Sequence, residues 1–323
     1  MFEEVVKIIR RYSKFLITTH INSDGDGVGS EVALSNMLRV LGKEVIIINP
    51  TPLPENYRFL DKEGSIKIFS KEHINLINET EVVFVLDISN WERIGVLGTF
   101  IKESKAIKIC IDHHISNTGF ADLNIIDERA SSTGEIIYDL VQSMGVTLDK
   151  RAAEGLYAAI LTDTGSFRFS NTTPKVHMIV SRLIEKGVNP YQIYEEVYEK
   201  RSPSRMKVLG LALTNLNLEC SGKLAWFCVT QEMMKKFNLH ADETESFVNQ
   251  LNYIDGVEVA IFFLEAEDNE VKVSLRSKRN VDVNVIANRL KGGGHSHAAG
   301  IRMNDSLKSA VNKVLAEVRK EFT

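Results

Sequence analysis

The sequence has little of several features that would assign it to a familiar class of protein. It contains three cysteines, Cys110, Cys220 and Cys228, and no C-x-x-C pair, which argues against a disulfide scaffold or a zinc ribbon and favours a reducing compartment. No apolar run approaches the roughly 18 residues that span a membrane, and the start, MFEEVVKIIRRYSKF, lacks the apolar region of a signal peptide. Only six prolines occur, so there is no Pro-rich spacer. We therefore expect a cytoplasmic protein that has no membrane partner.

An excess of positive charge is also missing. The chain has 39 Lys and Arg against 43 Asp and Glu, a formal net charge of −4, whereas proteins that coat long nucleic acids are usually strongly basic. This balance leaves room for a local basic groove that binds a short ligand. With 44% apolar and 25% charged residues the chain has an ordinary globular composition, and its length of 323 residues predicts about two domains.

Short apolar runs alternate with helical patterns in the first half of the chain. Four runs are too short and too continuous for amphipathic helices and predict buried strands, at residues 15–19, 45–48, 82–86 and 107–111. Apolar residues at helical spacing predict helices at residues 2–12, 28–41, 155–161, 178–186 and 191–201. Buried strands separated by helices indicate a parallel, doubly wound α/β sheet with helices on both faces.

The pattern changes after the SPS segment at residues 202–204. A helix is expected at residues 206–218, strands at residues 224–229, 257–264 and 271–275, and a final helix at residues 306–322. We therefore predict three parts: a parallel-sheet domain at residues 1–188, a helical linker at residues 189–218, and a smaller α/β domain at residues 219–323.

Aspartate and histidine gather at four places in the first domain, three of them just past a predicted strand. These residues are His20, Asp24 and Asp26, then Asp87, then Asp112, His113 and His114, and finally Asp163. The carboxyl ends of the strands of an open α/β sheet converge on one crevice, where so many carboxylates could not all stay ionised without compensation. Two divalent cations would offset four such charges. A mixed set of oxygen and nitrogen ligands suits Mn²⁺, Fe²⁺ or Mg²⁺ better than a structural zinc ion.

Two such ions roughly 4 Å apart can polarise a phosphoryl oxygen and support hydrolysis. Taken singly, each residue has a plainer interpretation: Asp24 or Asp26 is a helix N-cap, and Asp87 is a turn former. The grouping argues against these plainer interpretations, because five of the eight histidines fall inside motifs.

A second group of residues lies in the GGGHSHAAG segment, residues 292–300. Consecutive glycines allow backbone N–H groups to approach an anion, as in an anion nest. A flexible glycine turn is the plainer alternative, but two histidines follow the glycines directly. Upstream, Ser274, Arg276 and Ser277 end a predicted strand, and Arg276 would offer a phosphate a forked donor unless it is an ordinary solvated residue.

Six motifs occur in the order HINSDGDGVGS, VFVLDISNWERIG, IDHHISN, ASSTGE, LTDTGSFRFSNTT and GGGHSHAAG. With them the chain resembles the DHH phosphoesterases that carry a DHH-associated C-terminal domain, and within that family the oligoribonuclease and pAp phosphatase group. Two positions depart from the common pattern, Ser23 where many members have Pro and Gly27 where Ala is common, and neither is a ligand position. The resemblance implies an active site in the cleft between the two domains.

The resemblance also implies a role for each residue. The metal ligands would be His20, Asp24, Asp26, Asp87, His113 and Asp163, with Asp87 bridging two ions and Asp26 on the second ion. His114 would contact the scissile phosphate, and Asp112 would orient the imidazoles. Substrate recognition would fall to Arg276, Gly293, Gly294, His295 and His297, with Ser274 and Ser277 facing the same ligand. The two ions would be Mn²⁺, with Mg²⁺, Co²⁺ or Fe²⁺ as alternatives.

The implied activity is hydrolysis of short oligoribonucleotides, about two to five nucleotides long, to mononucleotides, and of pAp to AMP. A stand-alone phosphodiesterase for cyclic-di-AMP or pApA is the main alternative, because it can have the same two-domain form. A nucleotide-binding sensor without activity is a third, but it would be expected to have lost a metal ligand, and all six are present. The preferred substrate, the direction of degradation, the physiological metal and the oligomeric state, a homodimer included, are left open.

Overall fold

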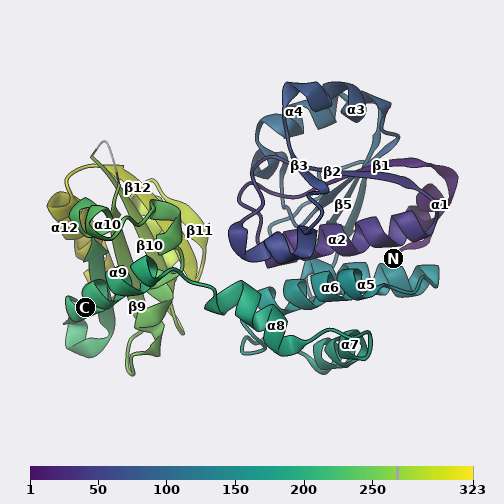
Figure 1. The fold of residues 1–323 in the computed structure, drawn as a ribbon. Helices are drawn as coiled ribbons and strands as arrows, with labels where there is room; N and C mark the ends of the chain where they lie inside the picture. Colours follow the sequence, from purple (N-terminus) through teal and green to yellow (C-terminus); the bar gives the residue numbers. More distant parts are fainter. Residues whose placement is uncertain (267–268, 323) are drawn as a thin grey trace. The chain divides into compact units, whose positions relative to one another are not determined.

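The computed structural model describes residues 1–266 and 269–322 (Figure 1). The chain forms two compact units, Met1–Lys200 and Arg201–Thr323, and each contains a six-stranded sheet. They are called here the N-terminal unit and the C-terminal unit. Among the described residues, no helix is both long enough and apolar enough to cross a lipid bilayer.

The N-terminal unit is built on a parallel sheet with the strand order β3-β2-β1-β4-β5-β6. β1 and β4 are neighbours although β2 and β3 separate them in the chain, so the strand order reverses beside β1. Loops at the carboxyl ends of strands beside such a reversal form the usual ligand site of this fold. The strands are β1 (Lys14–Thr18), β2 (Glu44–Asn49), β3 (Ile66–Ile68), β4 (Val82–Leu86), β5 (Ile107–Asp112) and β6 (Leu123–Ile126).

Helices cover both faces of this sheet, as Figure 1 shows. One core contains side chains of α1, α2, α5, α6 and α7, and the other contains side chains of α3 and α4. Because both faces are covered, β4 is buried at every position, which explains its continuous apolar sequence. The helices are α1 (Glu3–Arg11), α2 (Gly25–Val40), α3 (Ile74–Glu79), α4 (Val96–Glu103), α5 (Thr133–Met144), α6 (Lys150–Asp163) and α7 (Pro174–Glu185).

The helices α2 and α6 cross in close contact through two glycines. A Cβ atom added to Gly29 would lie 2.1 Å from the carbonyl oxygen of Gly155, and one added to Gly155 would lie 2.8 Å from the carbonyl oxygen of Gly29. A side chain at either position would force the helices apart. This crossing matters for the site described below, because α2 carries Asp26 and α6 ends at Asp163.

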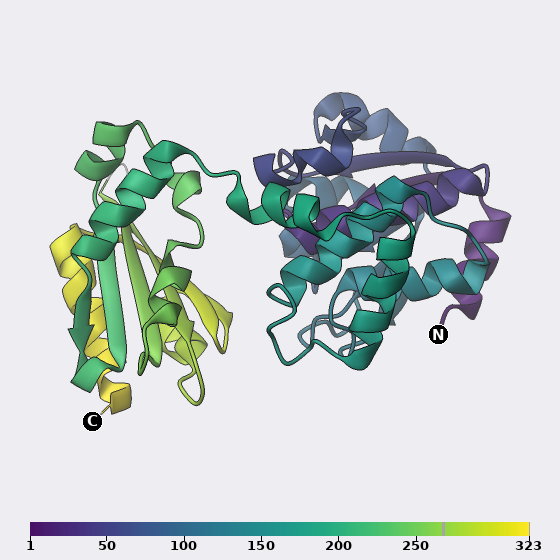
Figure 2. The same ribbon diagram turned by 60° about the horizontal axis from the view of Figure 1, so that its bottom comes forward.

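The C-terminal unit is a mixed sheet with the strand order β11-β12-β10-β9-β8-β7. α11 and α12 pack on one face, and Figure 2 shows α12 in yellow alongside the strands. α9, α10 and the 3-10 segment Phe247–Tyr253 pack on the other face. The elements are α9 (Pro203–Thr214), β7 (Asn217–Glu219), β8 (Leu224–Val229), α10 (Gln231–Phe237), β9 (Val259–Glu265), β10 (Glu270–Ser277), α11 (Val283–Arg289), β11 (Gly293–His295), β12 (Ala298–Asn304) and α12 (Leu307–Arg319).

The predicted fold class is confirmed, since a doubly wound parallel sheet is followed by a smaller α/β unit. The predicted strands match β1, β2, β4 and β5 in the first unit and β8, β9 and β10 in the second. The predicted linker, residues 189–218, is divided between the units, with α8 (Pro190–Tyr194) in the first and α9 in the second. The helix predicted at residues 206–218 is wrong at its end: it stops at Thr214, because Leu218 pairs with Ala225 in an antiparallel strand.

Candidate active site

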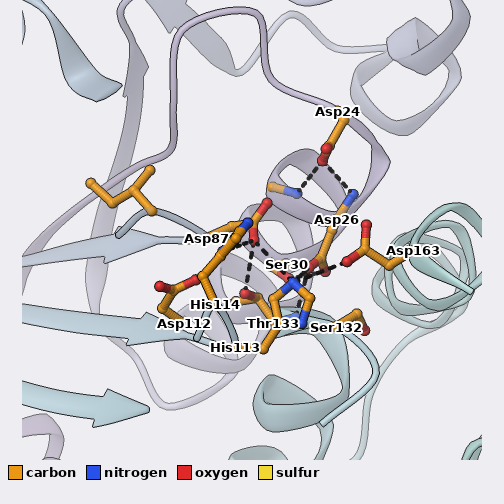
Figure 3. Close-up of polar contacts among 12 residues, drawn as sticks. Asp24, Asp26, Ser30, Asp87, Asp112, His113, His114, Ser132, Thr133 and Asp163 are labelled. Atoms are coloured by element: carbon orange, nitrogen blue, oxygen red, sulfur yellow. Dashed lines mark hydrogen bonds and ion pairs between the residues drawn. The ribbon is translucent and has the colours of Figure 1, made fainter. Parts of the chain in front are cut away.

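The Asp and His side chains singled out in the first domain come together at the carboxyl ends of β1, β4 and β5 (Figure 3). His20 follows β1, Asp87 follows β4, and Asp112 ends β5. Two further carboxylates come from helices: Asp26 lies in the first turn of α2, and Asp163 is the last residue of α6. The site is therefore formed by three strand ends and two helix ends.

His20, Asp24 and Asp87 form a first group of candidate metal-ligand atoms. Nε2 of His20 lies 3.8 Å from Oδ1 of Asp24 and 3.5 Å from Oδ2 of Asp87. The other ring nitrogen, Nδ1, lies 2.9 Å from the carbonyl oxygen of Ile21, which leaves Nε2 facing the carboxylates. His20 and Asp87 are buried. Asp24 is exposed and also caps the N-terminus of α2, so the cap role and the ligand position fall on the same side chain.

Asp26, His113 and Asp163 form a second group. Nε2 of His113 lies 3.0 Å from Oδ2 of Asp163 and 3.7 Å from Oδ2 of Asp26. The same nitrogen lies 3.7 Å from Oδ1 of Asp87, whereas Oδ2 of Asp87 faces His20. The two carboxylate oxygens of Asp87 thus face one group each.

The N-terminus of α5 holds Asp26 in place, a contact that sequence reasoning missed. The backbone N–H groups of Thr133 and Gly134 donate to Oδ2 and Oδ1 of Asp26, at 2.6 and 2.8 Å, so a helix N-terminus stabilises this buried carboxylate. The Thr133 hydroxyl also donates to Oδ1 of Asp87, at 3.1 Å. A signal was present in the ASSTGE motif, in which Ser132 caps α5 with the S-x-x-E spacing of a capping box.

Asp112 and Asn117 hold the ring of His114. Nδ1 of His114 lies 2.7 Å from Oδ1 of Asp112. Nδ2 of Asn117 donates to Oδ2 of Asp112 at 2.7 Å and to the carbonyl oxygen of Ile88 at 3.0 Å. Asp112 and Asn117 are both buried, so this chain of contacts is well placed to fix the orientation of the imidazole. Nδ1 of His114 also lies 3.7 Å from Oδ1 of Asp87, which places the ring at the edge of the carboxylate cluster.

Crowded acids perturb the titration of the whole site. Burial, together with the charges of Asp87 and Asp163, raises the pKa of Asp26 well above its ordinary value. Burial also raises the pKa of Asp163 to about 6. Burial lowers the pKa of His113, but its hydrogen bond with Asp163 and the charge of Asp26 outweigh burial and raise that pKa to about 10. The site therefore favours added positive charge.

The donor atoms fit divalent metal ions. Three overlapping groups have donor atoms within 4.8 Å of one another: Asp87 with His113 and His114, His20 with Asp24 and Asp87, and Asp26 with His113 and Asp163. Carboxylate oxygens and imidazole nitrogens without thiolates suit ions such as Mn²⁺ and Fe²⁺. Cations would also relieve the repulsion among the carboxylates.

The substrate-binding residues expected in the second domain lie around β10 and β11. Ser274 and Arg276 are half-buried positions on β10. Oγ of Ser277 lies 3.0 Å from Nδ1 of His297, so the structure brings these two side chains together. The side chain of His295 lies outside the described part of the structure.

The glycine run forms an edge strand instead of a curled nest, and anion binding by its backbone N–H groups stays a prediction. Residues 293–295 pair with residues 298–300 of β12 in a tight hairpin. Gly294 has a φ of 150°, and a Cβ atom there would lie 2.4 Å from the carbonyl oxygen of Ala298, so glycine is required. A nest needs successive N–H groups in a curled backbone, whereas this backbone is extended by its pairing with β12.

Known proteins match the chain over nearly its whole length. Residues 14–160 match the DHH family, N-terminal domain, and residues 225–323 match the DHHA1 domain. A Thermus thermophilus protein named bifunctional oligoribonuclease and PAP phosphatase NrnA is 32% identical, over 99% of this chain and 93% of that protein. A Bacillus subtilis protein of the same name is 32% identical, over 93% of this chain and 92% of that protein.

Solved structures share the fold. An exopolyphosphatase-related protein from Bacteroides fragilis has a TM-score of 0.96 at 29% identity, over 99% of this chain and 96% of that chain. The exonuclease RecJ bound to manganese has a TM-score of 0.55 at 13% identity, over 99% of this chain and 93% of that chain. Given the two domain matches and the 32% identity to a relative matched over 93% of its length, the chain belongs to the DHH family of phosphoesterases and carries a DHHA1 domain after its DHH domain.

Proposed function

We propose that this phosphoesterase uses two divalent cations to hydrolyse short oligoribonucleotides, of about two to five nucleotides, to mononucleotides, and pAp to AMP. The observation that carries the proposal is the position of Asp87, whose two oxygens face two separate groups of donor atoms. The substrate assignment is supported by the relatives from T. thermophilus and B. subtilis, which are named oligoribonuclease and PAP phosphatase. The scarcity of cysteine supports action in the cytoplasm.

The group around His20 and the group around His113 would each hold one cation, with Asp87 shared between the two. The ligands of the first would be His20 and Asp24, and those of the second Asp26, His113 and Asp163. Mn²⁺ suits this mixed set, and Mg²⁺, Co²⁺ or Fe²⁺ are alternatives. Support comes from RecJ, which shares the fold and has been crystallised bound to manganese. Two such ions, when bound, polarise the phosphoryl oxygens and offset the charge that develops during hydrolysis.

The remaining site residues bind and orient the substrate. The Asp112 carboxylate holds Nδ1 of His114, and Asn117 holds Asp112, so His114 meets the scissile phosphate with a fixed ring orientation. The second domain, residues 219–323, binds the nucleotide that the first domain, residues 1–188, hydrolyses. Its binding residues are Ser274, Arg276, Ser277, Gly293, Gly294, His295 and His297.

A substrate panel tests this proposal. The purified chain with Mn²⁺ is given RNA from a dimer to about 24 nucleotides, pAp, pApA and cyclic-di-AMP, and released nucleotide and inorganic phosphate are measured separately. We expect mononucleotides from short RNA, phosphate from pAp, and a kcat/KM that falls steeply beyond about five nucleotides. Equal efficiency on the longest RNA would contradict the short-substrate assignment. A strong preference for cyclic-di-AMP or pApA would replace it with the alternative phosphodiesterase.

A further inference from the structure

One face of the C-terminal sheet carries small and basic residues. Alternate residues of β10 and β12 are buried in the core beneath α11 and α12. Because successive side chains of a strand point to opposite faces, the residues between them lie on the other face. They are Lys272, Ser274 and Arg276 on β10, and Ala298, Gly300 and Arg302 on β12.

This other face is covered only in part. The core on that side lies over β8 and β9, beneath α9, α10 and the segment Phe247–Tyr253. Within residues 1–266 and 269–322, that core contains no side chain of β10, β11 or β12. Gly300 and Arg302 are exposed. The strip is therefore open along β12, whereas Lys272, Ser274 and Arg276 on β10 are half-buried.

The strand register arranges the strip in rows. Lys272 lies opposite Arg302 at one end, and Arg276 lies opposite Ala298 at the other. Between them, Ser274 lies opposite Gly300, which in turn lies opposite Gly293. The strip thus has a floor of small residues with cations at both ends. We call it the basic trough, defined by Lys272, Ser274, Arg276, Lys291, Gly293, Gly300 and Arg302.

The end of the basic trough at Lys272 is hollowed. A hollow of about 460 Å³ is lined there by Lys272, Val273, Lys291, Gly292, Gly300, Ile301 and Arg302. A Cβ atom on Gly292 would lie 2.3 Å from the carbonyl oxygen of Gly300, so the chain can pass this close only with glycine there. The cationic residues Lys272, Lys291 and Arg302 thus line the hollow together with the backbone of Gly292 and Gly300.

Of these three cations, only Arg302 pairs with an acid among the residues that the structure describes. Like charges directly opposite each other on neighbouring strands destabilise a sheet, and Lys272 lies opposite Arg302. Arg302 donates to Glu270 at 3.0 Å. The side chains of Lys272 and Lys291 form no hydrogen bond or ion pair with any residue in the described part of the chain. An anion in the hollow would relieve this repulsion.

We propose that the hollow end of the basic trough binds an internucleotide phosphate of a linear oligonucleotide, at a distance from the phosphate that Arg276 binds. This inference rests on the proposed function. Lys272 and Arg276 are four residues apart on β10, about 13 Å at roughly 3.3 Å per residue. The dinucleotide ApA has a single phosphate and cannot occupy both ends, whereas a longer strand can. Binding there is independent of base sequence, because lysine offers phosphate a point charge.

Charge-neutral variants of the full chain test this binding site. The double variant K272Q/K291Q keeps the apolar stems and removes two charges, and K308Q removes an exposed charge from α12 on the opposite face. For an RNA 5-mer, we expect K272Q/K291Q to raise KM about tenfold and to reduce the slope of log KM against log salt by about 0.7 to 1.4. The kcat/KM of K272Q/K291Q for ApA should stay within about twofold of wild type. The kcat/KM of K308Q should stay within about twofold of wild type for both the 5-mer and ApA. The thermal midpoint should stay level or rise, since like charges are removed.

Unchanged 5-mer kinetics in K272Q/K291Q, or an equal loss on ApA, would overturn the inference. Failure of the proposed function is seen separately, as a wild-type chain that releases no mononucleotide from either RNA. In that event, fluorescence anisotropy of a labelled 5-mer in EDTA decides about the basic trough. About tenfold weaker binding by K272Q/K291Q supports it, and binding equal to wild type overturns it.

Discussion

Asp87 is the residue on which the proposed two-ion site depends most. It has a left-handed backbone with a φ of 60°, a conformation that asparagine tolerates better than alanine does. We therefore expect Asp87→Asn to keep the fold while lowering kcat by more than about tenfold, or about 1.4 kcal/mol. Bound Mn²⁺, measured by elemental analysis, should fall as well. The thermal midpoint should not drop, because a carboxylate is removed from an acidic cluster. Retention of more than about a tenth of the wild-type kcat would rule out the bridging role.

Asn117 supports catalysis through Asp112. Asn117→Ala removes the amide that donates to Oδ2 of Asp112, so the His114 ring should lose its fixed orientation. We expect kcat to fall about ten- to hundredfold with metal content unchanged. Asn124→Ala is the matched control, because the Asn124 side chain holds the same loop through the backbone of residues 120 and 121. Equal losses in both variants would mean that the loop, rather than the contact to Asp112, matters.

Acids and imidazoles are the part of the site that the sequence can reveal. Such side chains are recognisable by type, and all those expected in the first domain lie in the cluster at the strand ends. The groups that hold them are different. Thr133 and Gly134 act through backbone N–H groups, which every residue except proline has, and they contact a carboxylate 107 and 108 positions away. Only the three-dimensional structure brings such partners together.

At the scale of helices, the crossing of α2 and α6 sets the distance between Asp26 and Asp163. Gly29→Ala would place a methyl group against the backbone of α6, and we expect it to destabilise the chain by about 1–3 kcal/mol and to lower activity. Gly210→Ala is the control, because a Cβ atom on Gly210 of α9 meets nothing within 4 Å. It should be neutral or stabilising, since alanine favours a helix over glycine. Thermal unfolding and kcat measure both effects, and equal stability of the two variants would contradict the tight crossing.

A buried carboxyl on α2 should make stability depend on pH. Glu31 accepts a hydrogen bond from Nδ2 of Asn49 at 2.9 Å, and burial raises its pKa from 4.5 to about 8. Folding therefore favours the protonated form, whose stabilising effect is full below pH 4.5 and is lost as pH rises through 8. Glu31→Gln stays neutral, so its thermal midpoint relative to wild type should increase between about pH 5 and 8. Glu103→Gln, which replaces an exposed carboxyl on α4, is the control. A flat difference for Glu31→Gln would mean that the carboxyl is ionised throughout.

Elements differ in how well their sequences reveal them. The central strands were predicted because both faces are covered and their residues are continuously apolar, as in β4. The edge strands β3, β6, β7 and β11 have three or four residues each, too few for a periodic pattern. Pairing with a longer neighbour, which lies elsewhere in the sequence, makes them strands. Length indicated two domains, and the pattern changes after the SPS segment at residues 202–204, close to the division at Lys200, although no Pro- or Gly-rich linker marks it.

For the whole molecule, we expect substrate binding and metal binding to be separable. Arg276→Ala should raise KM strongly and leave metal content, measured by elemental analysis, at the wild-type level, because every proposed ligand lies in the other unit. Arg319→Ala is the control, since this exposed arginine pairs with Glu219 away from the basic trough. Loss of metal from Arg276→Ala would show that the two units do not divide the work in this way. Kinetics equal to those of Arg319→Ala would show that Arg276 takes no part in substrate binding.

In both sheets, the two edge strands are the shortest strands. β3 and β6 close the first sheet with three and four residues, and β7 and β11 close the second with three residues each. An outermost strand offers unpaired backbone groups to any other chain, and long, flat edges promote fibrillar association. Cross-β stacking uses segments of about six or seven residues, more than any of these four borders supplies. The same brevity that hides these strands in the sequence thus leaves little exposed edge on which fibrillar pairing with another chain could begin.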